Sequence, residues 1–354
     1  MSELATSATA QLSARHLSRD FTSRVPGRFM NAKRVTHAVE DVTLDLIQGR
    51  VTAVVGESGS GKSVLARMLA RIVKPTSGEL LVEGTPVASR AKRDLAYASK
   101  VQLVLQDPFA SINPVHQIRH SLERPLLIHG AERSRVEELA SAVLARVSLD
   151  PSARFLERYP HELSGGQLQR VSIARALCVK PDVLLADEPI SMLDVSVRLG
   201  ILNLLKGLCD DERLAILYIT HDIASARYLA DEIIVMYAGQ VVERSRGTRL
   251  VDEPTHPYTQ LLIASVPDPS SPTSVAPATA EHASFEVPAR GCHFAPRCSH
   301  AMDVCRSESP PPFEVGEGHT SRCWLYAKDA GDTSAAVSQL APLARRGKGT
   351  ATKT

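Results

Sequence analysis

The chain has 354 residues, of which 44% are hydrophobic and 23% are charged, and its formal net charge at pH 7 is +2. Its length is typical of two domains, one large and one small, and its hydrophobic content is ample for a packed core. Because the charge is close to neutral, we expect no nucleic-acid partner.

The sequence carries no recognisable secretion or membrane-spanning signal. The N-terminal stretch MSELATSATAQLS lacks the basic segment and the apolar run of a secretory signal. A stretch of about 18 consecutive apolar residues, long enough to span a bilayer, does not occur. We therefore expect a cytosolic protein, in which clustered cysteines hold a metal more often than they form disulfides.

Short apolar runs alternate with helical patterns between about residues 13 and 265. Four runs are apolar throughout, which is typical of parallel strands covered on both faces. The predicted strands are VTAVVG (51–56), DVLLAD (182–187), AILYIT (215–220) and EIIVMYAG (232–239). The predicted helices are 62–73, 132–147, 166–178 and 196–209. This alternation predicts an α/β core.

The segments that flank this core have biased compositions. Residues 1–12 are small and polar, and we expect them to be disordered. Residues 266–290 are rich in Pro, Ser and Ala, which is typical of a linker. A cysteine-containing extension, 266–330 including the linker, then precedes a basic tail, 331–354, that we also expect to be disordered.

The segment GESGSGKS lies between a predicted strand and a predicted helix and matches the pattern G-x-x-x-x-G-K-[ST]. Its glycines let backbone N–H groups wrap around phosphates, and the helix N-terminus adds a favourable dipole. Lys62 would reach the β- and γ-phosphates, and the Ser63 hydroxyl would bind Mg²⁺. The predicted phosphate-binding residues are Gly56, Glu57, Ser58, Gly59, Ser60, Gly61, Lys62 and Ser63.

The segment VLLADE supplies two carboxylates at the end of a predicted strand. Asp187 would lie beside the metal, and Glu188 would lie next to the γ-phosphate and polarise the attacking water as a general base. Such a pair alone is as often a solvated strand end. The phosphate-binding pattern upstream favours the catalytic interpretation.

The segment LSGGQLQR (163–170) is much rarer than these two motifs. Ser164 is a good N-cap for a helix that begins near Gly166, and the two glycines and the helix dipole would form a second anion site. A second anion site on one chain would serve a function if it bound the nucleotide of another subunit. The residues predicted to contact the partner's ATP are Leu163, Ser164, Gly165, Gly166 and Gln167.

With these motifs the sequence resembles the ATP-binding subunits of ABC transporters over nearly all of its length. The resemblance implies a P-loop NTPase fold, the ABC cassette, in which a RecA-like core carries a helical subdomain at about 107–165 that docks on a permease. The implied ATPase domain covers 13–265, and ATP and Mg²⁺ are the implied cofactors.

The same resemblance implies roles for four further residues. Gln106 matches the glutamine that senses Mg²⁺ and contacts the membrane subunit, and Asp194 matches the D-loop aspartate. His221 matches the switch histidine at the γ-phosphate, a second catalytic candidate beside Glu188. Phe21 is the candidate for the aromatic ring that stacks on adenine.

One departure from the family pattern lies just before the D-loop aspartate. The sequence reads DEPISMLD, whereas the family commonly has Thr-Ser-Ala before Leu-Asp. Ile190 and Met192 are bulkier than usual at these positions. Because Asp187, Glu188 and Asp194 are present, we expect an altered contact between subunits and intact hydrolysis.

Four stretches resemble one importer group in particular, the oligopeptide/dipeptide/nickel family. They are QDPFASINP (106–114), RYPHELSGGQLQR (158–170), LDVSVRLGILNLL (193–205) and DEPTHPYTQLLIASVP (252–267). The stretch HPYT (256–259) begins the C-terminal extension of that family. The single uninterrupted cassette without membrane helices separates the chain from translation factors, repair proteins and fused exporters of the ABC class.

The resemblance implies an importer with two ATPase subunits, usually non-identical, two membrane permeases and an extracytoplasmic substrate-binding protein. The chain would lie at the cytoplasmic face of the cell membrane as a peripheral subunit, and ATP would be held between 56–63 of one ATPase and 163–167 of the other. The solute is expected to be an oligopeptide or dipeptide. The alternatives are nickel or another solute, or a soluble ABC ATPase with a regulatory metal module.

Four of the six cysteines lie near the C-terminus with the spacing Cys292-x5-Cys298-x6-Cys305-x17-Cys323. Zinc sites usually pair ligands across two to four residues, and the spacing matches neither common ferredoxin pattern. The spacing leaves iron–sulfur, zinc and unliganded thiols open, and the histidines that could join a zinc site are His293, His300 and His319. The family's extension has the form Cys-x-Phe-x-x-Arg-Cys, here CHFAPRC, and implies a [4Fe–4S] cluster, with zinc second and disulfides third.

Overall fold

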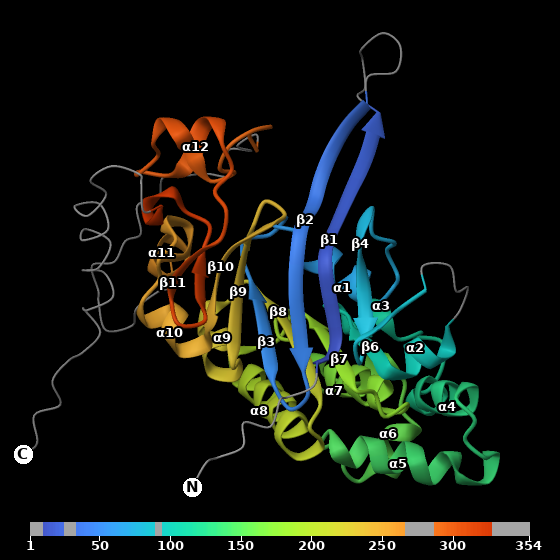
Figure 1. Cartoon of the computed structure of the whole chain (residues 1–354). Coiled ribbons are helices and arrows are strands. Elements are labelled where there is room, and N and C mark those ends of the chain that lie inside the picture. Colours follow the sequence, from blue (N-terminus) through green and yellow to red (C-terminus); the bar gives the residue numbers. More distant parts are fainter. Residues whose placement is uncertain (1–9, 25–32, 89–93, 266–286, 328–354) are drawn as a thin grey trace, which may run out of the picture. The chain divides into compact units, whose positions relative to one another are not determined.

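The computed structural model describes residues 10–24, 33–88, 94–265 and 287–327 (Figure 1). The chain divides into two compact units. The first unit comprises 1–20, 40–52 and 63–220, and the second comprises 21–39, 53–62 and 221–354. The basic tail 331–354 and most of the expected linker lie outside the described residues.

Three parallel strands form the centre of the first unit. β7 (Val183–Asp187) lies between β6 (Val101–Val104) and β8 (Ala215–Thr220), and Val183 is in register with Val101 and Ala215. Every residue of β7 and β8 is buried, because their apolar runs present side chains to both faces of the sheet. The strands predicted at 182–187 and 215–220 are confirmed.

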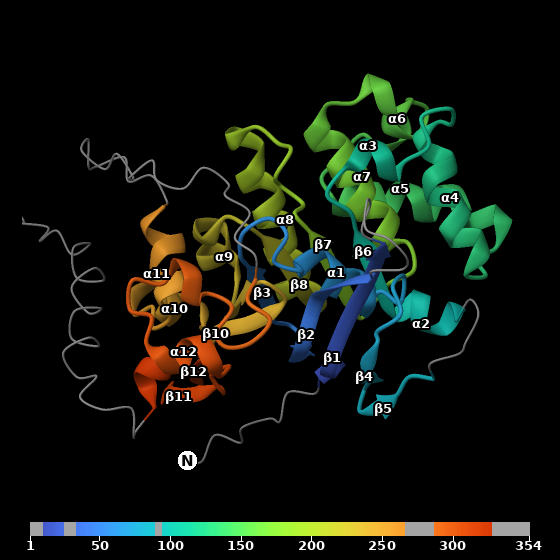
Figure 2. The ribbon, with the colours of Figure 1, turned by 90° about the horizontal axis from the view of Figure 1, so that it is seen from above.

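A group of helices in the first unit occupies the stretch in which the helical subdomain is expected (Figure 2). It consists of α3 (Pro108–Ser111), α4 (Ile118–Ile128), α5 (Val136–Arg146), α6 (Ser152–Leu156) and α7 (Gly165–Leu177). Leu122, Leu144 and Leu168 are fully buried among them. α8 (Val195–Glu212) packs against α7, and α5, α7 and α8 confirm the helices predicted there.

Antiparallel strands pair in the order β2-β1-β4-β5, and of these the end of β1 and the start of β2 are assigned to the second unit. Their bounds are β1 (Ala10–Arg24), β2 (Lys33–Ile47), β4 (Ser77–Val82) and β5 (Thr85–Pro86), with α1 (Lys62–Leu69) and α2 (Leu95–Lys100) as further helices. The expectation of disorder up to residue 12 is wrong for residues 10–12. Leu12 pairs with Val82 and is fully buried, so β1 begins at Ala10.

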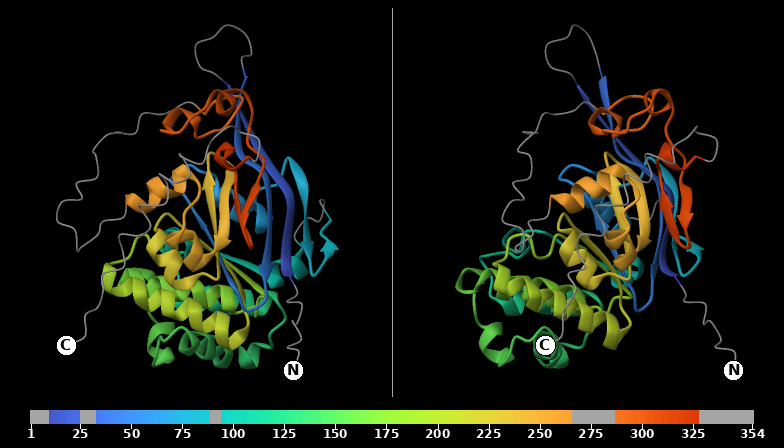
Figure 3. Two further views of the ribbon diagram at one scale, coloured as in Figure 1. Left: turned by 60° about the vertical axis from the view of Figure 1, so that its left-hand side comes forward. Right: turned by 90° about the vertical axis from the view of Figure 1, so that its left-hand side faces the viewer.

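The second unit contains antiparallel strands in the order β9-β10-β12-β11. They are β9 (Glu232–Tyr237), β10 (Gln240–Arg246), β11 (Phe313–Gly316) and β12 (His319–Ser321). Ala238 and Gly239 form the turn between β9 and β10 with positive φ, as a tight hairpin requires. Both views of Figure 3 show the red segment with β12 beside the yellow strands.

The remaining described elements are short. The second unit includes α9 (Ile223–Leu229), α10 (Gly247–Asp252), α11 (Pro257–Ala264) and α12 (Asp303–Ser307). Single turns of 3-10 helix cover Arg133–Arg135, Pro160–Glu162, Ala295–Arg297 and Trp324–Tyr326. β3 (Val51–Val55) is entirely buried and confirms the strand predicted at 51–56. None of the helices in the described ranges has the length and apolar character needed to cross a membrane.

The described part of the cysteine-containing extension, 287–327, lies within the second unit, so the separate small domain that the sequence predicts is not confirmed. β12 pairs with β10 through Glu243 and Arg244, so the extension continues the antiparallel strands of the second unit. Its own buried apolar cluster is small and centres on Cys323 and Leu325. Neighbouring strands therefore supply much of the support for this segment.

A buried carboxylate fixes the start of the HPYT stretch against β10 and β12. Glu243 accepts hydrogen bonds from the Thr255 N–H at 2.8 Å, the Thr255 hydroxyl at 2.9 Å and the His256 N–H at 2.9 Å. His319 Nε2 lies 2.8 Å from the same carboxylate, and both side chains are almost inaccessible to solvent. This network explains why HPYT has a defined place in the fold.

Candidate functional site

The segment 56–63, which we call the phosphate loop, joins β3 to α1. Gly61 has φ of 101°, and a Cβ there would lie 2.2 Å from the Ala38 carbonyl oxygen, so only glycine fits. Lys62 is buried and its Nζ donates to the carbonyl oxygens of Gly56 at 2.8 Å and Glu57 at 2.9 Å. The Lys62 ammonium group is thus bonded to carbonyl oxygens of its own loop. A bound phosphate would attract the same group.

A hydroxyl and a carboxylate from distant parts of the chain meet in the first unit. Ser63, in the first turn of α1, donates from Oγ to Asp187 Oδ1 at 2.9 Å. Asp187 is the last residue of β7 and is buried. Hydroxyl and carboxylate oxygens are ligands that Mg²⁺ prefers, so this pair fits the predicted metal role.

Glu188 lies directly after β7 in an unusual backbone conformation. Its φ is +47°, which is uncommon for a residue with a side chain, and its N–H donates to the Ile219 carbonyl oxygen at 2.9 Å. Gln106 Nε2 donates to Glu188 Oε2 at 3.1 Å and lies 3.4 Å from Ser191 Oγ. The sequence placed Gln106 and Glu188 in one site, but this direct bond between them was not predicted.

The signature segment forms the N-terminus of α7. Ser164 Oγ accepts the Gln167 N–H at 3.3 Å and Gln167 Oε1 accepts the Ser164 N–H at 3.1 Å, a reciprocal capping box. Gly165 already belongs to the helix, which begins one residue earlier than predicted. A Cβ on Gly166 would lie 2.4 Å from Val197 Cγ1, so this glycine allows α7 to pack closely against α8.

The two bulky residues before the D-loop aspartate have opposite environments. Ile190 is 4% exposed and belongs to the core, whereas Met192 is 62% exposed. Asp194 caps α8 through its carbonyl oxygen, which accepts the Val197 N–H at 2.9 Å. Of the two departures, only Met192 therefore adds apolar surface to the outside of the unit.

Two predicted residues of the nucleotide site belong to the second unit. His221 directly follows β8 and is exposed, and Phe21 lies near the end of β1 with 40% of its surface exposed. Exposure is compatible with contact to a nucleotide for both side chains. Their roles stay predictions.

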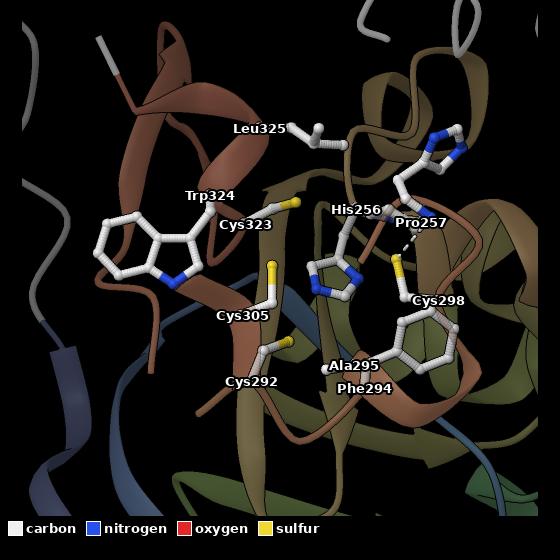
Figure 4. A pocket seen from close by; sticks show the side chains of 11 residues that line it. His256, Pro257, Cys292, Phe294, Ala295, Cys298, Cys305, Cys323, Trp324 and Leu325 are labelled. Atoms are coloured by element: carbon white, nitrogen blue, oxygen red, sulfur yellow. Dashed lines mark hydrogen bonds between the residues drawn. The ribbon is translucent and has the colours of Figure 1, made fainter. Parts of the chain in front are cut away.

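The four clustered cysteines line one pocket in the second unit (Figure 4). They come from different segments: Cys292 and Cys298 flank the 3-10 turn at Ala295–Arg297, Cys305 lies on α12, and Cys323 follows β12. The pocket has a cavity volume of about 10 Å³. None of the six cysteines, all of which lie in the described residues, forms a disulfide, which contradicts the disulfide alternative.

Burial makes Cys292, Cys298 and Cys323 poor acids. It raises the pKa of Cys292 to about 11 and that of Cys323 to about 12, and it also raises the pKa of Cys298. The positive charge of a bound metal would lower the pKa of these thiols and stabilise the sulfur atoms as thiolates. Within residues 10–24, 33–88, 94–265 and 287–327, no three His, Cys, Asp or Glu side chains are close enough to share one metal ion.

Two of the three histidines proposed for a zinc site have other partners. His293 Nδ1 lies 3.0 Å from the Ala238 carbonyl oxygen, and His319 faces Glu243. His300 lines the pocket, but its backbone N–H, 3.4 Å from Cys298 Sγ, makes the contact drawn in Figure 4. The structure therefore does not gather the histidines as zinc ligands.

Sequence reasoning missed a set of contacts between the phosphate loop and the C-terminal extension. Arg297 Nη1 and Nη2 donate to the Glu57 carboxylate at 2.7 and 2.9 Å, and the Glu57 N–H donates to the Tyr258 hydroxyl at 2.8 Å. The partners lie 240 and 201 residues from Glu57 in the chain. The only signals in the sequence are the arginine of CHFAPRC and the tyrosine of HPYT, and neither identifies its partner.

Comparison with family models divides the chain into two matched regions. Residues 39–191 match the model described as ABC transporter, and residues 242–305 match the oligopeptide/dipeptide transporter, C-terminal region. The first match contains the phosphate loop and the signature segment. The second contains HPYT and the first three clustered cysteines.

Several curated proteins are similar to the chain over most of their length. A probable peptide ABC transporter ATP-binding protein, y4tS of Sinorhizobium fredii, is 42% identical over 86% of this chain and 87% of its own. The oligopeptide transport ATP-binding protein AppF of Bacillus subtilis is 38% identical over 85% and 93%. The dipeptide transport ATP-binding protein DppF of Haemophilus influenzae is 39% identical over 84% and 91%.

Solved structures of ABC cassettes share the fold. The dimeric bacterial ABC transporter cassette MJ0796 is 28% identical, covers 66% of this chain and 98% of its own, and has a TM-score of 0.58. The cbiO1 protein of Clostridium perfringens, part of the cbiONQ ABC transporter complex, is 25% identical over 69% and 92%, with a TM-score of 0.60. The chain is therefore an ABC ATPase and belongs to the family of oligopeptide/dipeptide transporter ATP-binding subunits.

Proposed function

We propose that the chain hydrolyses ATP as the peripheral subunit of a peptide importer at the cytoplasmic face of the cell membrane. The support comes from relatives whose names specify peptide, oligopeptide or dipeptide transport, and from the matched C-terminal region. In such an importer a second, usually non-identical ATPase subunit pairs with this one beneath two permeases. An extracytoplasmic binding protein delivers the solute.

The hydrogen bond between Ser63 and Asp187 is the single observation that carries the catalytic part of the proposal. It joins the end of the phosphate loop to the end of β7, as a magnesium-dependent nucleotide site requires. Mg²⁺ would neutralise part of the charge on the β- and γ-phosphates. Lys62 would exchange its carbonyl partners in the loop for phosphate oxygens, and the remaining phosphate contacts would come from Gly56, Glu57, Ser58, Gly59, Ser60 and Gly61.

Glu188 is the proposed general base, and Gln106 is the residue that controls it. In the structure Gln106 Nε2 occupies one oxygen of the Glu188 carboxylate. A carboxylate that accepts this bond is a weaker acceptor for the proton of an attacking water. If Gln106 moved away, Glu188 would lose this bond and become a stronger proton acceptor. A subunit that contacts the segment around Gln106 could therefore control the rate of hydrolysis.

The remaining predicted residues complete the nucleotide site. The signature residues 163–167 would present the Ser164 hydroxyl and the N-terminal N–H groups of α7 to the partner subunit's ATP. Asp194 would lie in the contact between the two ATPases, His221 would contact the γ-phosphate, and Phe21 would stack on adenine. These assignments follow the family motifs that these residues match.

Transport assays of the reconstituted complex test the proposed function. A panel of dipeptides, oligopeptides and nickel would be offered on the binding protein while ATP hydrolysis is measured. We expect peptides to stimulate hydrolysis several-fold over the binding protein alone. Stimulation by nickel instead would assign the alternative solute, and a chain that hydrolyses ATP without binding membrane partners would favour the soluble ATPase.

We also propose that the four clustered cysteines hold a [4Fe–4S] cluster. The support is the donor set, since four free thiols line one pocket and four thiolates are the usual ligands of such a cluster. A cluster has a core of several atoms, so its ligands lie farther apart than those of a single ion.

Anaerobic purification tests the cluster. The protein should be brown and contain about four iron and four acid-labile sulfide per chain. Substitution of Cys305 by Ser should remove most of the iron, whereas the same change at Cys209, a buried cysteine outside the pocket, should leave it in place. Colourless protein with stoichiometric zinc would contradict the cluster.

A further inference from the structure

Arg297 of the C-terminal extension and Tyr258 of HPYT hold the phosphate loop at the same point. Arg297 binds both oxygens of the Glu57 carboxylate, and Tyr258 accepts the Glu57 backbone N–H. The side chain of Arg297 is 18% exposed and that of Glu57 is 43% exposed. The ion pair is therefore partly shielded from water, and its planar two-bond geometry restricts both side chains.

Aromatic rings hold Arg297 in place behind this contact. Its guanidinium lies 5.7 Å from the centre of the Tyr237 ring and 5.6 Å from that of Phe294. Phe294 is 2% exposed and meets Tyr237 edge to face at 5.2 Å. Arg297 is thus a fixed cation whose position depends on the packing of the segment that carries it.

That segment is the one bounded by Cys292 and Cys298. It also reaches the phosphate loop by a second route, because His293 contacts the Ala238 carbonyl oxygen and the adjoining Gly239 donates its N–H to Ser60 O at 3.0 Å. Both routes lie within the second unit. A change in the segment between these two cysteines would consequently displace contacts of the phosphate loop.

The charge of Glu57 gives this connection a consequence for nucleotide binding. Glu57 belongs to a loop that would surround the phosphates of ATP, and an unpaired carboxylate there would repel them. We propose that Arg297 is a positioning residue, which neutralises and orients Glu57 so that the cysteine-bearing segment sets the affinity of the phosphate loop for ATP. This inference rests on the proposed function, because it requires that the loop bind ATP.

Titration of the full-length chain with a fluorescent ATP analogue tests the inference. Arg297→Gln should weaken binding about tenfold, the size of a modest coupling between two sites. Arg297→Lys, which keeps the charge but loses the two-bond geometry, should give an intermediate affinity. Glu57→Gln combined with Arg297→Gln should restore most of the affinity, because the double variant leaves no unpaired carboxylate at the loop.

Arg244→Gln is the matched control. Arg244 also binds a carboxylate through two bonds, to Glu232 at 2.7 and 3.0 Å, in the same unit and with side chains of similar exposure. We expect it to bind the analogue as tightly as the unmodified chain does. Thermal unfolding of each variant identifies any that fails to fold.

A second readout uses the coupling in the other direction. A nucleotide on the loop should slow amide hydrogen exchange in residues 292–298 of the unmodified chain and leave its rate nearly unchanged in Arg297→Gln, because coupling between two sites is reciprocal. Mass spectrometry of the peptide that contains residues 292–298 measures this exchange. A residue that only stabilises the fold would not remove this nucleotide dependence.

Three outcomes would overturn the inference: a folded Arg297→Gln chain that binds as tightly as the unmodified chain, an equal loss in Arg244→Gln, or a double variant no tighter than Arg297→Gln. The proposed function fails separately. If Lys62→Ala still binds the analogue tightly, the phosphate loop is not the nucleotide site. If Lys62→Ala loses binding and Arg297→Gln does not, only the role of Arg297 is wrong.

Discussion

At the scale of single residues, the structure shows contacts between side chains that the sequence predicted for the nucleotide site without predicting their partners. The hydrogen bonds from Ser63 to Asp187 and from Gln106 to Glu188 join residues 124 and 82 positions apart. Local motifs predicted that Ser63, Asp187 and Glu188 serve the nucleotide site, whereas the role of Gln106 was implied by the family resemblance. The bond between Gln106 and Glu188 adds a restraint on the base that the motifs do not contain.

Glu188→Gln should bind ATP and hydrolyse it at least about a hundredfold more slowly, because the amide cannot accept the proton of the attacking water. Hydrolysis and nucleotide binding measured on the same preparation separate the two effects. Turnover of Glu188→Gln close to that of the unmodified enzyme would place the base elsewhere.

At the scale of elements, the parallel strands and the long helices could be predicted because their signals are local. β7 and β8 are unbroken apolar runs, and α7 begins with a capping box that is readable in the letters LSGGQ. The partners of Glu57 and Glu243 could not be predicted in this way. The donors to Glu57 lie 201 and 240 residues away, and His319 lies 76 residues from Glu243. No local pattern specifies such contacts.

The network around Glu243 should be important for stability. Glu243→Gln replaces one of the two acceptor oxygens with an NH2 group, which would face either the Thr255 or the His256 N–H and leave that buried donor unpaired. We expect unfolding to become easier by about 2–4 kcal/mol. Glu314→Gln, an exposed position on β11, is the control and should change the free energy of unfolding by no more than about 0.5 kcal/mol. Equal effects in denaturant titrations of the two variants would contradict a specific role for the network.

At the scale of the whole molecule, the chain is one half of an ATPase pair in the function proposed above. Met192 is largely exposed, and Val195 after it is 78% exposed, beside the D-loop aspartate. The departure from the family pattern predicts an altered contact between subunits at this place. In the structure Ile190 is buried in the core, whereas Met192 is exposed. Only the exposed residue is expected to act on the partner.

Substitution of Met192 by Ser should weaken the ATP-dependent pairing of this chain with its partner ATPase by about tenfold, since a buried methionine contributes about 1.5 kcal/mol or more. The measurement is size-exclusion chromatography with ATP, on chains that also carry Glu188→Gln to prevent turnover. Ile72→Ser, at a position 65% exposed, is the control for loss of apolar surface. Unchanged pairing would show that Met192 lies outside the contact.

The pairing of β12 with β10 has a practical consequence for shortened versions of the chain. Without residues 287–327, β10 would keep β9 on one side and present unpaired N–H and C=O groups on the other. An open strand edge of this kind recruits strands from other molecules. A cassette ending at residue 265 should therefore self-associate at concentrations where the full chain stays dispersed, and light scattering of the two would measure the difference.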